Sequence, residues 1–460
     1  MLTKYSAGAR LDRLPMSHYH RIILLIIALA FMFDSIELGM MTFLLGSIRA
    51  EFGLTAAQAG LLGSSSFVGM VFGAAIAGYL ADRFGRRPIF QLSIVIWGGA
   101  SLLCSFAQSY HELLIYRVLL GFGMAMEFPI AQSMLSELIP AQKRGRYVAL
   151  MDGFWPIGFI SAGVLAYFIL EPLGWRQVFL LLALPAVFVF VIRWWIPESP
   201  RWLEQAGQGA EAEAVLAQME ARVMKSLGVT QLPTPEGAPR GAVHQRKTSL
   251  LSLLRPQLRC RTLMIWGLWF FALLGFYGLT TWLGALLQQA GYAVTQSVLY
   301  TVTISVGGIP GFLTVAWLIE RWGRKRMCLV TLFGSAIMAT LYGQVAQAGV
   351  SLVLLFSVGF FMQFFMFGMW AVLYAYTPEL YDTHVRATGS GCASAVGRIG
   401  SLLGPFIVGL ILPWTGQGGV FMLGAGSFVV AAFVVWAWGI ETKGLSLEAV
   451  QQQARGGDHP

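Results

Sequence analysis

The chain has 460 residues, of which 57% are hydrophobic and only 12% are charged, and its mean hydropathy is +0.67. A soluble domain carries about 25% charged residues, so this composition excludes an ordinary soluble protein. The formal net charge of +9 would suit a nucleic-acid partner, but the positions of the basic residues, given below, do not.

Twelve apolar runs are each long enough to cross a bilayer, because about 20 residues of helix span its hydrocarbon core. They cover residues 21–48, 56–81, 88–108, 110–139, 146–170, 174–196, 259–289, 295–319, 327–346, 350–378, 387–412 and 417–440. In lipid every backbone polar group must be paired, so each run is a helix or a strand of a closed barrel. The runs lack the alternation of barrel strands, so we predict an all-α polytopic membrane protein with 12 transmembrane helices.

The longest hydrophilic stretch, residues 197–258, separates six predicted spans from six. We therefore expect an N-terminal six-helix bundle at 21–196 and a C-terminal six-helix bundle at 259–440, flanked by cytoplasmic tails at 1–20 and 441–460. Within the cytoplasmic linker, the Ala- and Glu-rich residues 208–226 predict a helix lying on the membrane surface, and a Pro- and Gly-containing connector follows it.

The basic residues are distributed unevenly between the two predicted sides of the membrane. Of the 31 Lys and Arg residues, Arg49 and Arg176 lie in loops on one side, and Arg117 and Arg398 lie inside spans. The others lie at the chain ends, in the hairpins of the opposite side and in the linker. Basic loops stay in the cytoplasm, so we predict a multi-pass protein of the inner (plasma) membrane with both termini cytoplasmic. The charge then reflects topology and attraction to membrane lipids, and we expect no nucleic-acid partner.

Charged segments recur along the chain at a nearly constant spacing. The clearest pair is Asp82-Arg83-Phe84-Gly85-Arg86-Arg87 and Glu320-Arg321-Trp322-Gly323-Arg324-Lys325. Further partners are Glu137 and Glu379, Arg144 and Arg386, and Glu198 and Glu441. Partners in the three sets of acids differ in residue number by 238, 242 and 243. This agreement indicates a duplicated chain, so we predict two pseudo-symmetric six-helix bundles, an architecture typical of transporters.

Several motifs resemble those of a known superfamily. Residues 20–445 resemble the major facilitator superfamily, and Pro197-Glu198-Ser199-Pro200-Arg201 and the segment Pro378–Gly389 resemble its sugar-porter, organic-ion and metabolite:proton symporter branches. The first span is similar to the Asp-x-x-Asp pattern of aromatic acid:proton symporters, with Asp34 kept and Glu37 in place of the second Asp. Together with the segments 123–129 and 154–156, the chain resembles bacterial niacin transporters. The resemblance implies secondary transport by a twelve-helix fold.

The repeated charges predict a cytoplasmic gate in which acids and cations pair across the two halves of the chain. Each partly exposed pair contributes about 1 kcal/mol, so the network rather than one pair would hold the gate shut. The alternative is that the cations only fix the topology, although that role does not need matched acids. The predicted gate residues are Asp82, Arg83, Arg86, Arg87, Glu137, Arg144, Glu198, Arg201, Glu320, Arg321, Arg324, Glu379, Arg386 and Glu441.

Ionisable residues inside predicted spans are costly and therefore indicate function. Arg398 is the predicted anchor for an anion, because a guanidinium stays charged and binds a carboxylate through two hydrogen bonds. Alternatively, Arg398 pairs with an internal acid. Asp34, Glu37 and Glu127 are predicted at the substrate site and as proton carriers, with Asp34 first and Arg117 its partner in coupling. The alternative for Asp34 and Arg117 is a permanent ion pair between the first and fourth spans.

Aromatic residues near Pro- and Gly-containing parts of the spans are the predicted walls of the substrate site. Flat side chains around one arginine suit a small aromatic carboxylate. The alternative for each is an interfacial or packing role. The candidates are Phe128, Phe154, Trp155, Phe276, Tyr277, Trp282, Trp370 and Tyr374.

Glycine pairs at a spacing of four, Gly69 with Gly73 and Gly400 with Gly404, predict close helix approach, through plain packing or sliding.

The sequence as a whole predicts a proton-coupled symporter that imports a small organic anion, with nicotinate the leading candidate, by rocker-switch alternating access. Other aromatic carboxylates, organic cations and sugars remain alternatives, as does a non-transporting sensor. Arg398 argues against cations, and the scarcity of amides in the spans, chiefly Gln132 and Gln363, argues against sugars. The chain lacks a phosphate-binding loop motif and a His-Glu-x-x-His motif, so we expect that it is not an enzyme and uses no cofactor or metal. We also expect it to be a monomer.

Overall fold

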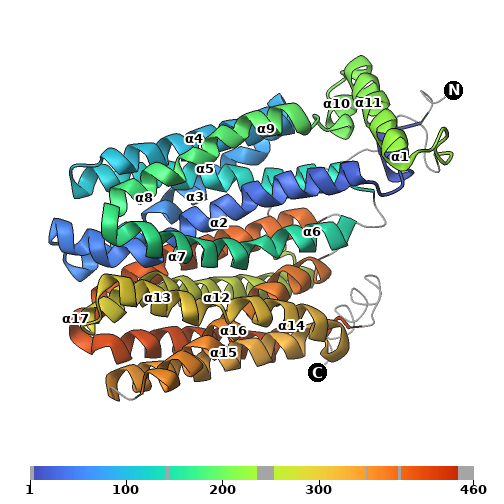
Figure 1. Cartoon of the computed structure of the whole chain (residues 1–460). Helices are drawn as coiled ribbons and strands as arrows, with labels where there is room; N and C mark the ends of the chain where they lie inside the picture. The colour runs from blue at the N-terminus through green and yellow to red at the C-terminus, as the bar shows by residue number, and fades with distance from the viewer. Residues whose placement is uncertain (1–4, 141–143, 236–252, 349–350, 382–384, 444–460) are drawn as a thin grey trace, which may run out of the picture. The chain divides into compact units, whose positions relative to one another are not determined.

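The computed structural model of the chain describes residues 5–140, 144–235, 253–348, 351–381 and 385–443 (Figure 1). Eleven helical segments of this part of the chain are long and apolar enough to cross a membrane. The prediction of an all-α membrane protein is therefore confirmed.

Helices of the first half of the chain follow the predicted spans closely. They are α1 (Ala7–Asp12), α2 (His18–Phe52), α3 (Ala56–Phe84), α4 (Arg86–Phe106), α5 (Tyr110–Leu138), α6 (Arg144–Asp152), α7 (Phe154–Leu173), α8 (Trp175–Leu182), the 3-10 helix η3 (Leu184–Val187), α9 (Phe188–Trp195), α10 (Pro200–Gln205) and α11 (Gly209–Leu227). The fifth predicted span is divided between α6 and α7. The sixth is broken at η3, where Pro185 lacks the backbone N–H that a continuous helix needs.

The second half contains fewer, longer helices. They are α12 (Pro256–Gln289), α13 (Val294–Ser305), α14 (Gly308–Trp322), α15 (Arg324–Ala348), α16 (Leu352–Glu379) and α17 (Arg386–Trp438). α13 and α14 together form the eighth predicted span. α17 covers the eleventh and twelfth, and it is interrupted at Gly416, whose φ of 63° and ψ of −169° are not helical.

Glycine ends α3 and α14 at corresponding places in the two halves. Gly85 separates α3 from α4 with a φ of 104°, and Gly323 separates α14 from α15 with a φ of 94°. Only glycine adopts such a conformation without strain, which explains why each repeated charged motif contains one.

The chain forms two compact units that combine segments distant in sequence. The first comprises Met1–Glu37, Val68–Gly158 and Arg176–Gln245, and the second comprises Leu38–Phe67, Phe159–Trp175 and Arg246–Pro460. The division into bundles at 21–196 and 259–440 stays a prediction.

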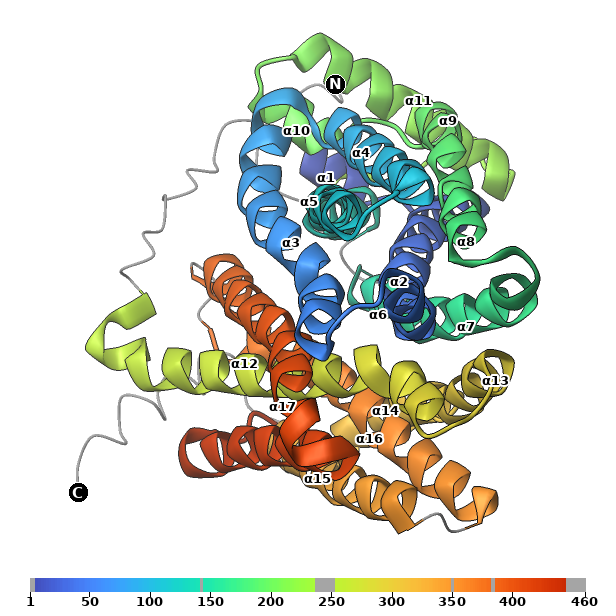
Figure 2. The same cartoon turned by 90° about the vertical axis from the view of Figure 1, so that its left-hand side faces the viewer.

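Close backbone contacts hold pairs of helices together within each unit. α4 packs against α5, and α12 packs against α17 (Figure 2). A methyl group on Gly69 would stand only 1.8 Å from the Val118 carbonyl oxygen of α5, and one on Gly400 only 2.2 Å from the Phe270 carbonyl oxygen of α12. The predicted close approach at both glycine pairs is confirmed, because a side chain there would collide with backbone.

α11 coincides with the helix predicted at residues 208–226, but its apolar face is covered by protein. Leu216, Met219 and Val223 are buried, and α11 contacts α1 and α10 (Figure 1). Residues 7–12, predicted only as part of a tail, form α1 of this small helical cluster.

Candidate functional site

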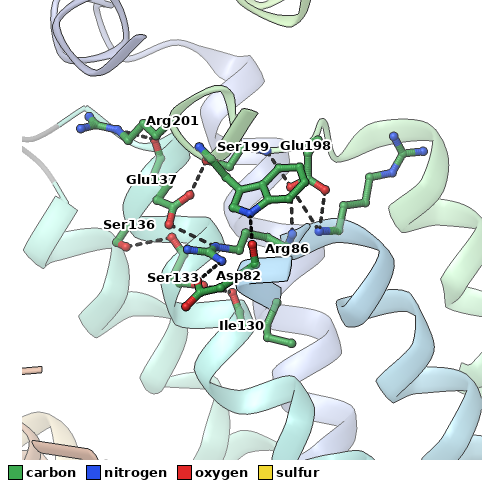
Figure 3. Close-up of polar contacts among 11 residues, drawn as sticks. Asp82, Arg86, Ile130, Ser133, Ser136, Glu137, Glu198, Ser199 and Arg201 are labelled. Carbon is green, nitrogen blue, oxygen red and sulfur yellow. Dashed lines mark hydrogen bonds and ion pairs between the residues drawn. The ribbon is translucent and has the colours of Figure 1, made fainter. Parts of the chain in front are cut away.

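A charged cluster in the first unit contains several of the predicted gate residues (Figure 3). Arg86, at the start of α4, donates to Asp82 Oδ1 at 2.5 Å, and its Nε lies 3.5 Å from Glu137 Oε1 at the end of α5. The Ser199 hydroxyl donates to Glu137. One guanidinium thus joins the ends of three helices, α3, α4 and α5.

Glu198 caps the beginning of α4. Its carboxylate accepts the backbone N–H of Arg86 at 3.0 Å and that of Arg87 at 3.1 Å. These N–H groups have no partner inside the helix, and the positive end of the helix dipole favours an acid there. Burial raises the pKa of Glu198, although the N–H groups of Ser199, Arg87 and Arg86 counteract the shift.

Other predicted gate residues of the first unit lie around this cluster. Arg201 donates to Asp12 Oδ1 at 2.8 Å and to the Glu137 carbonyl oxygen at 3.4 Å. Arg83 is more exposed and donates to the Tyr79 hydroxyl at 3.1 Å. Arg144 begins α6, but its side chain lies outside the described residues.

The second unit contains the same cluster in the corresponding residues. Arg324 lies 2.9 Å from Glu320 and 3.0 Å from Glu379. Glu441 accepts the backbone N–H of Arg324 at 2.8 Å, and the Thr442 hydroxyl donates to Glu379 at 2.6 Å. The bonds of Arg324, Glu441 and Thr442 correspond to those of Arg86, Glu198 and Ser199. One bond differs, because Glu441 accepts its second backbone N–H from Arg326, whereas Glu198 accepts it from Arg87.

Two further predicted gate residues have different surroundings. Arg321 lies 3.9 Å from the ring centre of Trp317, and its carbonyl oxygen accepts a hydrogen bond from Lys443. Arg386 begins α17, and its side chain lies outside the described residues. The bonds given above all join residues of one unit, so the pairing of gate residues between the halves stays a prediction.

A buried polar group in the first unit contains two of the predicted ionisable residues. Glu37 of α2 and Arg117 of α5 are both buried and interact electrostatically. Ser101 of α4 donates to the Glu37 carboxylate at 3.3 Å, and the Arg117 guanidinium lies 6.0 Å from the ring centre of Phe179. Asp34, predicted as the first coupling residue, is buried one turn before Glu37 on α2.

Glu127, the third predicted acid, is also fully buried in α5. The Trp97 indole N–H of α4 donates to its Oε2 at 2.8 Å. Trp97 and Ser101 lie four residues apart on one face of α4, and each donates a hydrogen bond to a buried carboxylate. The sequence analysis predicted a role for neither Trp97 nor Ser101. Two side chains that can form hydrogen bonds, four residues apart in an apolar span, could have indicated them.

The predicted aromatic residues fall into two groups. In the first unit, the Phe31 ring centre lies 5.1 Å from that of Phe128 and 5.0 Å from that of Trp155, whose carbonyl oxygen accepts the Ser35 hydroxyl at 2.6 Å. Phe154 is half-buried beside Trp155.

The group in the second unit surrounds Trp370. Tyr374 is stacked on Trp370 with ring centres 5.7 Å apart, and Phe276 and Tyr277 meet Trp370 edge-on. Arg398 of α17 is half-buried and close enough to Tyr277 for an electrostatic interaction. A cation and several flat rings therefore occur within one unit, and their role as a substrate site stays a prediction.

Trp282 lies elsewhere in α12. Its indole N–H donates to the Pro405 carbonyl oxygen of α17 at 2.9 Å, and its side chain is fully buried. This bond gives Trp282 a role in packing, and its place at the substrate site stays a prediction. Among the residues that the structure describes, three or more His, Cys, Asp or Glu side chains nowhere gather as a metal site would need.

Comparison with known proteins identifies the class. The family model described as sugar (and other) transporter matches residues 21–454. A structure of the xylose transporter XylE from E. coli, in a partially occluded inward-open conformation, matches with a TM-score of 0.75 and 19% identity, covering 94% of this chain and 100% of that one. The chain therefore belongs to the sugar (and other) transporter family of the major facilitator superfamily, and it is a membrane-spanning transporter rather than an enzyme.

Two relatives from different organisms are similar to this chain over most of its length. The niacin transporter NiaP of Acinetobacter baylyi is 35% identical over 443 residues, which are 96% of this chain and 99% of that protein. The synaptic vesicle 2-related protein of Pongo abelii is 30% identical over 445 residues, which are 91% of this chain and 78% of that protein.

Proposed function

We propose that the protein is a proton-coupled symporter that imports nicotinate, or another small aromatic carboxylate, across the inner membrane. The observation that carries the proposal is the presence of fully buried acids, Glu37 and Glu127, within helices that cross the membrane. Such groups cost several kcal/mol and persist in membrane proteins mainly where they carry protons or ions. The 35% identity to a niacin transporter favours nicotinate as cargo.

Substrate binding in this proposal centres on the second unit. Arg398 would hold the carboxylate through two charge-assisted hydrogen bonds, and the stacked rings of Trp370 and Tyr374 would hold the flat ring. Gly397 and Gly400 keep α17 close to α12 and leave Arg398 the bulkiest polar group of its turn.

Proton coupling centres on Glu37 and Arg117. A carboxyl group in an apolar interior accepts a proton more readily than one in water, and a nearby guanidinium opposes this. Glu37, which interacts electrostatically with Arg117, is the first residue to test, and Asp34 and Glu127 are further candidates. Protonation from an acidic exterior would release Glu37 from Arg117 and allow the loaded carrier to reorient.

The carrier would work as a monomer by rocker-switch alternating access, with both termini cytoplasmic. The two matched clusters at Arg86 and Arg324 would stabilise the state in which the cytoplasmic side is closed. Their duplication supports this role, because each half then contributes an equivalent set of bonds that can break and reform.

Purified protein in liposomes tests the proposal. Uptake of radiolabelled nicotinate should exceed that of empty vesicles and should increase under an inward proton gradient. Arg398→Ala should abolish nicotinate binding, whereas Glu37→Gln should retain binding and lose accumulation driven by the gradient. Absence of uptake with and without the gradient would refute nicotinate as cargo, and gradient-driven accumulation by Glu37→Gln would refute Glu37 as the coupling residue.

A further inference from the structure

A single buried hydroxyl stands between the Glu37 carboxylate and a backbone carbonyl group. Ser101 Oγ lies 3.3 Å from Glu37 Oε2 and 3.1 Å from the carbonyl oxygen of Phe179. Ser101, Glu37 and Phe179 all have no solvent-exposed surface. A serine hydroxyl has one proton, so it donates to only one of these two acceptors at a time.

The choice between the acceptors depends on whether Glu37 carries a proton. A charged Glu37 only accepts hydrogen bonds, so Ser101 turns its proton toward the carboxylate. A neutral Glu37 has its own O–H, which can donate to Ser101 Oγ. Ser101 is then free to donate to the Phe179 carbonyl oxygen, and a continuous chain of hydrogen bonds joins α2 to α8.

Phe179 lies in the last turn of α8, just before the break in the sixth span. Its carbonyl oxygen also accepts the N–H of Ala183, the last residue before η3, at 3.0 Å. Its ring lies beneath the Arg117 guanidinium, which interacts with Glu37. Both partners of Glu37, Ser101 and Arg117, therefore lie against the same residue, one turn before this span loses its regular helix.

We propose that Ser101 is a positioning residue that transmits the protonation of Glu37 to the break in the sixth span, by moving its hydroxyl proton from the carboxylate to the Phe179 carbonyl group. The inference rests on the proposed proton coupling. The titratable and charged groups that face Glu37 are Arg117 of α5, Cys104 of α4 and, one turn away on its own helix, Asp34.

Ser101→Ala tests the inference, with Ser93→Ala as its control. Ser93 is equally buried in α4, but its hydroxyl donates to the Phe90 carbonyl oxygen of the same helix. Hydrogen bonds to charged groups are stronger than those between neutral groups, so loss of the Ser101 hydroxyl disfavours the charged form of Glu37 more than the neutral form. The pH at half-maximal uptake should therefore rise by about one unit in Ser101→Ala. It should stay unchanged in Ser93→Ala and return toward the original value in Ser101→Thr.

Infrared difference spectroscopy makes the test independent of the cargo. The band of a protonated carboxyl group that is lost in Glu37→Gln should change in frequency in Ser101→Ala and titrate at a higher pH. If nicotinate is not transported but this band responds, the cargo is refuted and the role of Ser101 stands. If the band and the uptake profile of Ser101→Ala match those of the unmodified protein, or if Ser93→Ala shifts them equally, the inference is refuted.

A second and independent observation concerns the N-terminal segment. Residues 6–13, here called the strap, are joined to α11 by the side chain of Arg10, which is only 2% exposed. Arg10 donates to Glu213 at 2.6 Å and to Glu220 at 3.0 Å, and Arg13 also donates to Glu220 at 2.7 Å. Further along the strap, Asp12 accepts from Arg201, the residue that also donates to the Glu137 carbonyl group.

The strap makes the two charged clusters unequal. Ser199 corresponds to Thr442 at a spacing of 243 residues, and the same spacing places Gly444 opposite Arg201. The second cluster therefore has no arginine at the position that corresponds to Arg201, the residue that binds Asp12 of the strap. We infer that the strap restrains the first cluster alone, so that the two copies of the gate open with different ease.

Hydrogen exchange followed by mass spectrometry compares the two clusters within one molecule. Asp12→Asn should increase exchange at residues 82–90 and 134–140 by about threefold or more, and should leave residues 320–330 unchanged. Lys225→Gln removes an exposed charge from α11 and should leave hydrogen exchange unchanged in both clusters. Equal responses of both clusters, or no response of the first, would refute the inference.

Discussion

Trp370 is the residue whose surroundings bear most directly on substrate choice. Its side chain is buried among four aromatic rings, yet its indole N–H has no hydrogen-bond partner among the described residues. A buried donor without a partner costs about 1–3 kcal/mol, so a ligand that supplies an acceptor is favoured. The pyridine nitrogen of nicotinate is such an acceptor, whereas the corresponding C–H group of benzoate is not.

Trp370→Phe should therefore reduce discrimination between these two acids. We expect the apparent affinity for nicotinate to fall about tenfold while that for benzoate is nearly unchanged, because sites built to hydrogen-bond a substrate reject analogues that lack the group. Competition of each acid against labelled nicotinate uptake measures the ratio. An equal loss for both acids would indicate that Trp370 contributes only stacking.

At the scale of the helix, the close packing of α17 on α12 depends on the absence of a side chain at Gly400. A methyl group there would stand 2.2 Å from the Phe270 carbonyl oxygen, so the backbones of α12 and α17 would have to separate. Overpacking of this kind costs about 1–3 kcal/mol. Gly400→Ala should lower the melting temperature of the detergent-solubilised protein. Gly391→Ala in the same helix, where a methyl group meets nothing within 4 Å, should leave it unchanged or raise it.

The contact between α1 and α11 should depend on pH through Glu220. Burial tends to raise the pKa of Glu220, but hydrogen bonds from Arg10 and Arg13 outweigh it and hold the pKa below its usual range. An acid whose pKa is lowered by folding stabilises the fold above its unfolded value of about 4.3, and the stabilisation is lost as pH falls through the folded value.

Glu220→Gln should accordingly lower the melting temperature at neutral pH. The difference from the unmodified protein should narrow as the pH falls from about 4.3, the unfolded value, through the lower folded pKa, because a protonated Glu220 is uncharged like the glutamine of the variant. Thermal unfolding across this pH range measures it. A difference that stays constant with pH would contradict the prediction, because it would show that the charge of Glu220 does not stabilise the fold.

The elements could be predicted from the sequence far better than their contacts. Run length and charge located the spans, and the charged repeat fixed the duplication, because both signals are local. The bond from Arg10 to Glu220 joins residues 210 apart, and that from Ser101 to Glu37 joins residues 64 apart. Such bonds depend on which helix faces meet, and run length does not encode this. Pro185 and Gly307, at breaks in two spans, were visible in the sequence and could have been used.

At the scale of the whole molecule, the duplicated clusters offer a comparison that few proteins allow. Glu137 pairs with Arg86 at the start of α4, Glu379 pairs with Arg324 at the start of α15, and each acid also accepts a hydroxyl hydrogen bond. The side chains of Glu137 and Glu379 are largely buried, whereas that of Glu320, which also pairs with Arg324, is 69% exposed. Ion pairs that include an exposed side chain contribute only about 0–1 kcal/mol.

Glu137→Gln and Glu379→Gln should therefore destabilise the protein to a similar extent, by more than Glu320→Gln does. Each removes the charge that Arg86 or Arg324 requires, and a hydrogen bond to a charged group contributes about 1.5–3 kcal/mol. Glu320→Gln removes an exposed charge from the same cluster and serves as the control. Melting temperatures of the three single variants and of the double variant Glu137→Gln/Glu379→Gln test this. If the clusters act independently, the two losses should add, because distant sites without shared partners are additive within about 0.5 kcal/mol. A double variant less destabilised than the sum would show that opening one cluster already releases the other.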